Sequence, residues 1–178
     1  MAGKAKPIAV EIDLSEPCAK WRANLPGIDK LCQDAASAAL AVCGNAIAGV
    51  KAELSLVLAD DAALRELNRD FRGQDKPTNV LSFPSGEKPK PGAPMVLLGD
   101  VVLAYETVAR EAHAQGKSLA EHAAHMVVHG VLHLLGFDHE SNEVDAQRME
   151  ALETQVLAKL GVPNPYRIRT NTRAKTRD

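Results

Sequence analysis

Three histidines have the types and spacing that could do chemistry. His129 and His133 are four residues apart, and His139 follows beyond Gly136. On a helix, residues four apart lie one turn above the other, so two imidazoles can share one metal ion. His125 is separated from His133 by about 12 Å of helix rise, which is too far for both to reach one ion. A turn at Gly136 can bring the chain back, so His139 is the expected third ligand.

The full pattern, H-x-x-x-H-x-x-G-x-x-H, has the spacing of the metzincin zinc motif. Three neutral imidazoles leave one coordination position open, which is typical of a catalytic rather than a structural site. One zinc ion is expected, although imidazoles also suit nickel, copper or iron. Metalloproteases place a glutamate general base directly after the first histidine, and here that residue is Gly130. The pattern predicts a metal site and argues against peptide hydrolysis.

The first two of these histidines lie on a predicted helix. Ser118 and Glu121 have the spacing of a capping box, so the helix is expected to begin near Leu119. Gly136 is the residue type that ends a helix in the left-handed conformation. These signals place the histidines in the second half of the helix, with the turn directly after it.

The second half of this helix is apolar almost all round. Between Met126 and Phe137, His129 and His133 are the only side chains with hydrogen-bonding groups. Two polar side chains in an apolar segment indicate a buried helix that carries a site. His122 and His125 are expected on the exposed first half of the helix, or at best as outer contacts of the ligands.

At these residues the sequence resembles the YbeY endoribonuclease family. The family signature is similar to HGVLHLLGFDH, which runs here from His129 through Asp138 to His139. A second block, RGQDKPTNVLSFP from Arg72 to Pro84, resembles the family's other marker, as does Leu98-Gly99-Asp100. The resemblance covers about residues 50 to 160. Many members carry Asp where this chain has Asn79, so no carboxylate is available there.

The resemblance implies a metal-dependent hydrolase: a zinc-dependent endoribonuclease specific for single-stranded RNA. It implies work in ribosomal RNA maturation, especially at the 3′ end of 16S RNA, and in ribosome quality control. RNA, and the ribosome or ribosomal proteins, are the expected partners. A dication on neutral ligands attracts phosphodiesters and lowers the pKa of bound water toward about 7, so metal-activated water is the expected nucleophile.

Arg72 is the candidate catalytic residue outside the histidine cluster. It follows a predicted helix, and its planar, permanently charged fork suits a phosphate oxygen. A surface arginine that offsets the dipole at a helix end is the alternative. On the residues alone the two interpretations are equal, and the resemblance favours catalysis.

Two other functions stay open at this point. One is a metzincin-like metallopeptidase, which Gly130 disfavours. The other is a ribosome-assembly or RNA-binding factor whose metal only holds the fold. The formal net charge of -2 mildly favours this factor, because a free-standing RNA binder is often strongly basic.

The composition indicates one domain. The 178 residues are 46% hydrophobic but only 3% aromatic, so we expect an aliphatic core. We expect a single hydrolase domain over residues 1–160 and a basic, flexible tail over residues 161–178. That tail is either a nucleic-acid arm or a solvated terminus. Its charged residues are Arg167, Arg169, Arg173, Lys175, Arg177 and Asp178.

The cysteines and the hydropathy pattern favour a cytoplasmic protein. Cys18, Cys32 and Cys43 are odd in number and have no metal-ligand spacing, as expected of reduced core residues. The chain shows neither the apolar segment of a signal peptide nor the roughly 20 apolar residues of a membrane span. No membrane partner is expected, and the sequence does not predict the oligomeric state.

Hydrophobic periodicity predicts an α+β fold in which the metal site lies on a central buried helix. About five helices are expected to pack on a small mixed sheet. The expected strands are residues 8–14, 54–58, 80–83 and 96–104. Besides the histidine helix, we expect helices after Pro26 as far as Gly44, from Asp60 or Asp61 to Gly73, and over residues 106–115 and 143–160. The second of these should bury Leu64, Leu67 and Phe71, and the last Met149, Leu152, Val156 and Leu160.

Overall fold

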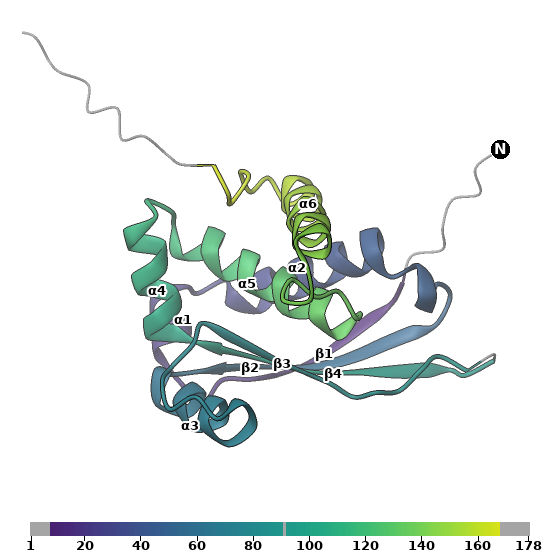
Figure 1. Cartoon of the computed structure of the whole chain (residues 1–178), viewed down its shortest axis with the longest axis horizontal. Helices are drawn as coiled ribbons and strands as arrows, with labels where there is room; N and C mark the ends of the chain where they lie inside the picture. Colours follow the sequence, from purple (N-terminus) through teal and green to yellow (C-terminus); the bar gives the residue numbers. More distant parts are fainter. Residues whose placement is uncertain (1–7, 91, 168–178) are drawn as a thin grey trace, which may run out of the picture.

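A four-stranded mixed sheet forms one layer of the protein (Figure 1). The computed structural model describes residues 8–90 and 92–167. The strands follow the order β1-β2-β4-β3; β1 and β4 run parallel to β2, and β3 runs antiparallel to β4. Strand β3 is therefore an edge strand. The bounds are β1 Val10–Ser15, β2 Lys51–Ala59, β3 Val80–Pro84 and β4 Met95–Ala104.

The helices confirm the predicted α+β class. Five long helices lie close to their expected positions: α2 Ile28–Cys43, α3 Asp61–Arg72, α4 Tyr105–Ala114, α5 Leu119–Leu134 and α6 Glu143–Lys159. Two short elements were not expected, α1 Lys20–Asn24 and the 3-10 turn η1 Asn45–Ile47. Helix α1 is too short to show periodicity, and Trp21 anchors it: the ring is fully buried and its Nε1 donates to Ala59 O at 2.9 Å.

The sheet has helices on both faces, in unequal number. Helices α2, α5 and α6 lie on one face, and α3 lies on the other (Figure 1). The larger core fills the first interface, where alternate residues of β2, among them Leu54 and Leu56, are fully buried. A smaller cluster containing Leu64 and Leu81 lies under α3. Helix α5 therefore packs in the larger of the two cores.

Two predicted helix faces are partly wrong. In α3, Leu64 is buried and Leu67 half-buried, but Phe71 is 68% exposed, and Asn68 is buried instead. Asn68 Nδ2 donates to Lys76 O at 2.8 Å, so a polar contact with the following loop, not an apolar stripe, sets this face of the helix. In α6, Leu152 and Leu160 are only half-buried, and Glu153 and Leu157 belong to the fully buried face.

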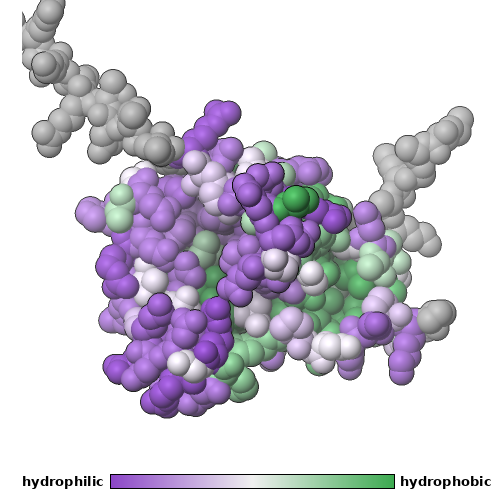
Figure 2. Space-filling view, viewed as in Figure 1, coloured by the Kyte–Doolittle hydropathy of each residue, from purple (hydrophilic) through white to green (hydrophobic). Residues whose placement is uncertain are grey.

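The surface is mostly hydrophilic over α3 and α4, and apolar surface gathers over the opposite end of the sheet, where β2 and β4 begin (Figures 1 and 2). Within the described residues, no helix is long and apolar enough to cross a membrane.

Candidate metal centre

Local signals in the sequence position the histidine helix. The Ser118 hydroxyl accepts from the backbone of Glu121, and the Glu121 carboxylate accepts from the backbone of Ser118, which is the predicted capping box. After α5 the chain turns at Gly136, whose φ of 93° favours glycine. This turn carries His139 back toward the end of the helix.

The three predicted ligands meet at one point. The ring centroids of His129, His133 and His139 are 4.7, 5.0 and 5.1 Å apart in their three pairs, and one ligand atom from each lies within 4.8 Å of the others. The Nε2 atoms of His129 and His133 are 3.1 Å apart. A tetrahedral ion with bonds of about 2.0–2.1 Å holds its ligand nitrogens about 3.3 Å apart. The spacing of His129 and His133 is close to that value, and His139 lies within reach of the same point.

A buried carboxylate that sequence reasoning missed holds His129. Glu153 of α6 is fully buried and accepts from His129 Nδ1, from His125 Nε2 at 3.0 Å, and from the Tyr166 hydroxyl. Burial raises the pKa of Glu153, but the bonds from His125 and His129 outweigh burial and lower it to about 2. An ionised carboxylate only accepts hydrogen bonds, so Nδ1 of His129 carries the proton and Nε2 presents its lone pair to the cluster.

The donor set fits a metal ion. Burial, together with the neighbouring His129 and His139, lowers the pKa of His133 to about 4, so this imidazole is neutral at pH 7. A neutral imidazole is the form that binds metal. A dication can bond the lone pairs that converge from all three rings, whereas a shared proton bridges only two of them. The residues present thus suit one divalent ion.

His122 and His125 are not exposed, so that expectation is wrong. Their exposed fractions are 2% and 7%, because α4 and α6 pack beside α5. His125 matches the alternative expectation, since it shares Glu153 with the ligand His129. His122 Nε2 lies 3.7 Å from the carboxylate of Glu111 on α4.

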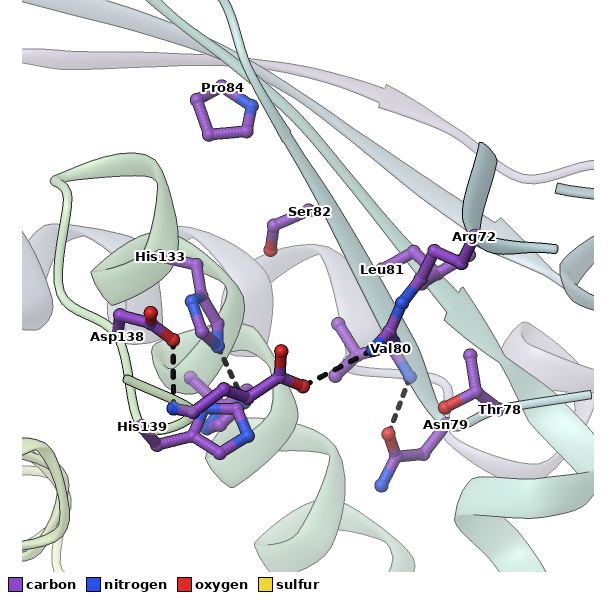
Figure 3. A pocket seen from close by; sticks show the side chains of 12 residues that line it. Arg72, Thr78, Asn79, Val80, Leu81, Ser82, Pro84, His133, Asp138 and His139 are labelled. Carbon is purple, nitrogen blue, oxygen red and sulfur yellow. Dashed lines mark hydrogen bonds and ion pairs between the residues drawn. The ribbon is translucent and has the colours of Figure 1, made fainter. Parts of the chain in front are cut away.

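Arg72 lies across a cleft from the histidines. The cleft has a volume of about 340 Å³; Arg72 and Asn79 lie on one side, and His133 and His139 lie on the other (Figure 3). The Arg72 side chain extends from the last residue of α3, and its guanidinium donates to Glu140 Oε1 at 3.2 Å. Both side chains are exposed, by 41% and 65%, so this ion pair is weak.

Polar residues between these two sides hold the cleft in shape. Ser82 of β3 donates its hydroxyl to Gly130 O at 3.0 Å, which ties the edge strand to the histidine helix. Asn79 accepts from the Val80 backbone and donates to Glu111 at 3.2 Å. Asp138 accepts from the backbone of Glu140 at 3.0 Å. Asp138 therefore caps the turn that presents His139.

Gly130 is glycine because the sheet is too close for a side chain. A Cβ there would lie 2.5 Å from Val101 Cγ1 and 3.2 Å from Ser82 Oγ. A side chain at the position where metalloproteases carry their glutamate base would overlap Val101 in this fold, so Val101 or the backbone would have to shift. The absence of that base is built into the packing of α5 on β4.

Beyond α6, residues 161–167 run back over the domain. The Tyr166 ring packs edge to face on His125 with centroids 5.6 Å apart, and Lys117 Nζ donates to Pro165 O at 2.7 Å. The predicted basic tail begins in this segment. Its remaining charged residues, from Arg169 onward, lie outside the described residues.

Comparison with known proteins gives one consistent result. A family model described as "Endoribonuclease YbeY" matches residues 21–161. A protein named endoribonuclease YbeY from Paramagnetospirillum magneticum is 53% identical over 163 residues, covering 89% of this chain and 97% of that protein. A protein of the same name from Rhodospirillum rubrum is 51% identical over 168 residues, covering 90% and 82%.

Among solved structures, the solution structure of TM1509 from Thermotoga maritima has a similar fold. The TM-score is 0.53 at 24% sequence identity, and the match covers 85% of this chain and 88% of the other. This likeness supports the arrangement of the sheet and helices.

Proposed function

The chain belongs to the endoribonuclease YbeY family, and from that premise we propose that it cleaves single-stranded ribosomal RNA with one zinc ion held by His129, His133 and His139. The membership makes it an endoribonuclease, a hydrolase of RNA phosphodiester bonds. The observation that carries the proposal about the site is that the three imidazoles and Arg72 face one cleft.

In this proposal the metal, when bound, supplies Lewis acidity and a water whose pKa is lowered toward about 7. The chain's own residues supply orientation. Glu153 fixes the proton of His129 on Nδ1, so that Nε2 faces the cluster. The capped turn at Asp138 positions His139.

Arg72 would bind the phosphate of the RNA. Its fork matches two phosphate oxygens, and its charge stabilises the negative charge that develops during cleavage. The exposed contact with Glu140 contributes little, typically below about 1 kcal/mol, so an RNA phosphate can displace that carboxylate. The ion pair between Arg72 and Glu140 would then form only while RNA is absent.

The cellular task that we propose is maturation of the 16S ribosomal RNA 3′ end and ribosome quality control, in the cytoplasm, with the ribosome or ribosomal proteins as partners. Support comes from the signature at residues 129–139 and the block at residues 72–84. Cells that lack the protein should accumulate 16S RNA with an unprocessed 3′ end. The wild-type gene should restore processing, and a gene carrying His133→Ala should not.

The decisive experiment compares wild type, His133→Ala and Arg72→Ala on single-stranded RNA, with metal content and melting temperature measured on the same preparations. Arg69→Ala is the matched control, because Arg69 lies in the same last turn of α3 and pairs with Asp70. We expect wild type and the control to cleave. Both site variants should fold without cleaving, and metal should be lost only from the histidine variant.

Two other outcomes would favour the other functions. If all variants cleave RNA equally, the cleft is not the active site. If no protein cleaves RNA and His133→Ala unfolds, the metal holds the fold and the protein acts as an assembly factor. A casein assay on the same samples tests peptidase activity, for which we expect no cleavage because Gly130 supplies no general base.

A further inference from the structure

Phe71 is an exposed aromatic ring in a chain with few aromatic residues. Only 3% of the residues are Phe, Trp or Tyr, yet Phe71 is 68% exposed. It precedes Arg72 at the end of α3. An exposed apolar ring gives up the burial that stabilises a fold, and this ring adjoins a candidate catalytic residue in the sequence.

The ring is held in place on one side only. Phe71 packs edge to face on Phe83 of β3, with centroids 5.1 Å apart and planes at 63°. Phe83 itself packs into the small cluster under α3. Phe71 therefore has a fixed neighbour while most of its surface stays open to solvent.

Phe71 and its neighbour Phe83 lie on the α3 side of strand β3, and the cleft lies on the other side of this strand. Because side chains alternate along a strand, Ser82 contacts the histidine helix while Phe83 faces α3. Strand β3 is at the edge of the sheet, and Arg72 reaches past it to Glu140 on the cleft side. A nucleic-acid strand that has a phosphate on Arg72 and continues around the β3 edge would therefore meet the open face of Phe71.

We propose that Phe71 is a stacking platform for a nucleobase of the RNA, on the part of the strand that continues from the cleft around the β3 edge. This inference rests on the proposed function. Every base has a π-face, so stacking tolerates any sequence, and it requires a base that is not already stacked in a duplex. The platform thus gives a physical reason for a preference for single strands that the histidine cluster alone lacks.

The kinetic test compares Phe71→Ala, Phe71→Leu and Phe71→Tyr on single-stranded RNA. Loss of one stacked base should lower kcat/KM by roughly 5- to 150-fold in the alanine variant. The leucine variant, which keeps an apolar contact with Phe83, should be equally slow, and the tyrosine variant should match wild type. Val144→Ala is the control, because Val144 is 74% exposed on α6 and should show no change.

A set of RNAs that each lack one base locates the stacked nucleotide. One abasic position should slow wild type by the same factor as Phe71→Ala, and that variant should be insensitive to it. The proposal is overturned if alanine at position 71 leaves cleavage unchanged, or if leucine restores it, since leucine indicates an apolar contact without stacking.

A fluorescence experiment separates this proposal from the proposed function. In Phe71→Trp, made on a His133→Ala background so that RNA stays intact, single-stranded RNA should quench the introduced indole. The chain has one tryptophan, Trp21, which is fully buried, so the same protein without the Phe71 change provides the baseline. If wild type does not cleave RNA, quenching still supports the platform. No quenching overturns it.

Discussion

Substituting Glu153 with glutamine tests whether the buried carboxylate holds the metal ligand His129 in place. Glutamine has nearly the same shape but offers one acceptor oxygen and one NH2 group in place of two acceptors. Glu153 accepts from His129 at Oε1 and from His125 and Tyr166 at Oε2. The amide cannot serve both sets, so the proton of His129 is no longer fixed on Nδ1.

The expected magnitudes follow from this contact set. Loss of a partner that orients a metal ligand typically weakens metal binding by about 10- to 100-fold. Hydrogen bonds to a charged group are worth about 1.5–3 kcal/mol, so the metal-free glutamine variant should lose about that much free energy of unfolding. Glu153→Ala leaves the buried partners of the carboxylate unpaired, so the free energy of unfolding should fall by about 3–5 kcal/mol.

The assay combines metal competition against a chromophoric chelator with denaturant unfolding of the metal-free protein. Glu150→Gln provides the control, because Glu150 is exposed on the same helix one turn earlier. If Glu153→Gln binds metal as tightly as wild type while unfolding more easily, the carboxylate stabilises the fold without orienting the ligand. The reasoning about His129 would then be refuted.

Three further substitutions or conditions give clear expectations. Gly130→Ala should lower the free energy of unfolding by about 1–3 kcal/mol, because its Cβ would overlap Val101. An unchanged denaturant midpoint would show that Val101 and the sheet move aside without cost. The pKa of His133 is about 4 in the metal-free fold against 6.5 when unfolded. Between these two pH values the unfolded chain binds more protons than the folded protein, so the free energy of unfolding should fall by roughly 1–3 kcal/mol from pH 6.5 to pH 4. Urea unfolding at a series of pH values measures this loss. His133→Gln should remove the contribution of His133 to it. Burial raises the pKa of Cys32 to about 12, so this thiol should resist alkylation at pH 8 until the protein is denatured, and rapid native labelling in mass spectra would contradict the packing of α2.

Local spacing predicted the part of the site that lies on one helix and its turn. Helix rise alone rejected His125 as a ligand, and Gly136 indicated the turn that returns His139. The capping box at Ser118 was equally local and is confirmed. Such features depend on neighbours within a few residues, so the sequence contains them directly.

Glu153 could not be found in this way, because its contact with His129 spans 24 residues between two helices. One signal was present: Glu153 stands four residues after Met149 and three before Val156, on the buried face of α6. A carboxylate on such a face needs a buried partner.

Burial of the remaining residues depends on which elements pack over them. Phe71 has the spacing of a core residue after Leu64 and Leu67, yet its ring packs edge to face on Phe83 and stays 68% exposed. His122 and His125 are polar and precede the apolar half of α5, yet α4 and α6 bury them. Periodicity gives the phase of a helix but not the extent of its neighbours.

The order in which the ribosome makes this chain has a consequence for the enzyme. Synthesis runs from the N-terminus, so His129, His133 and His139 leave the ribosome before Glu153, which accepts a hydrogen bond from His129. A nascent chain therefore holds its ligands without the carboxylate that orients them. Under the proposed function, full cleavage activity is expected only after α6 has been synthesised and has packed against α5.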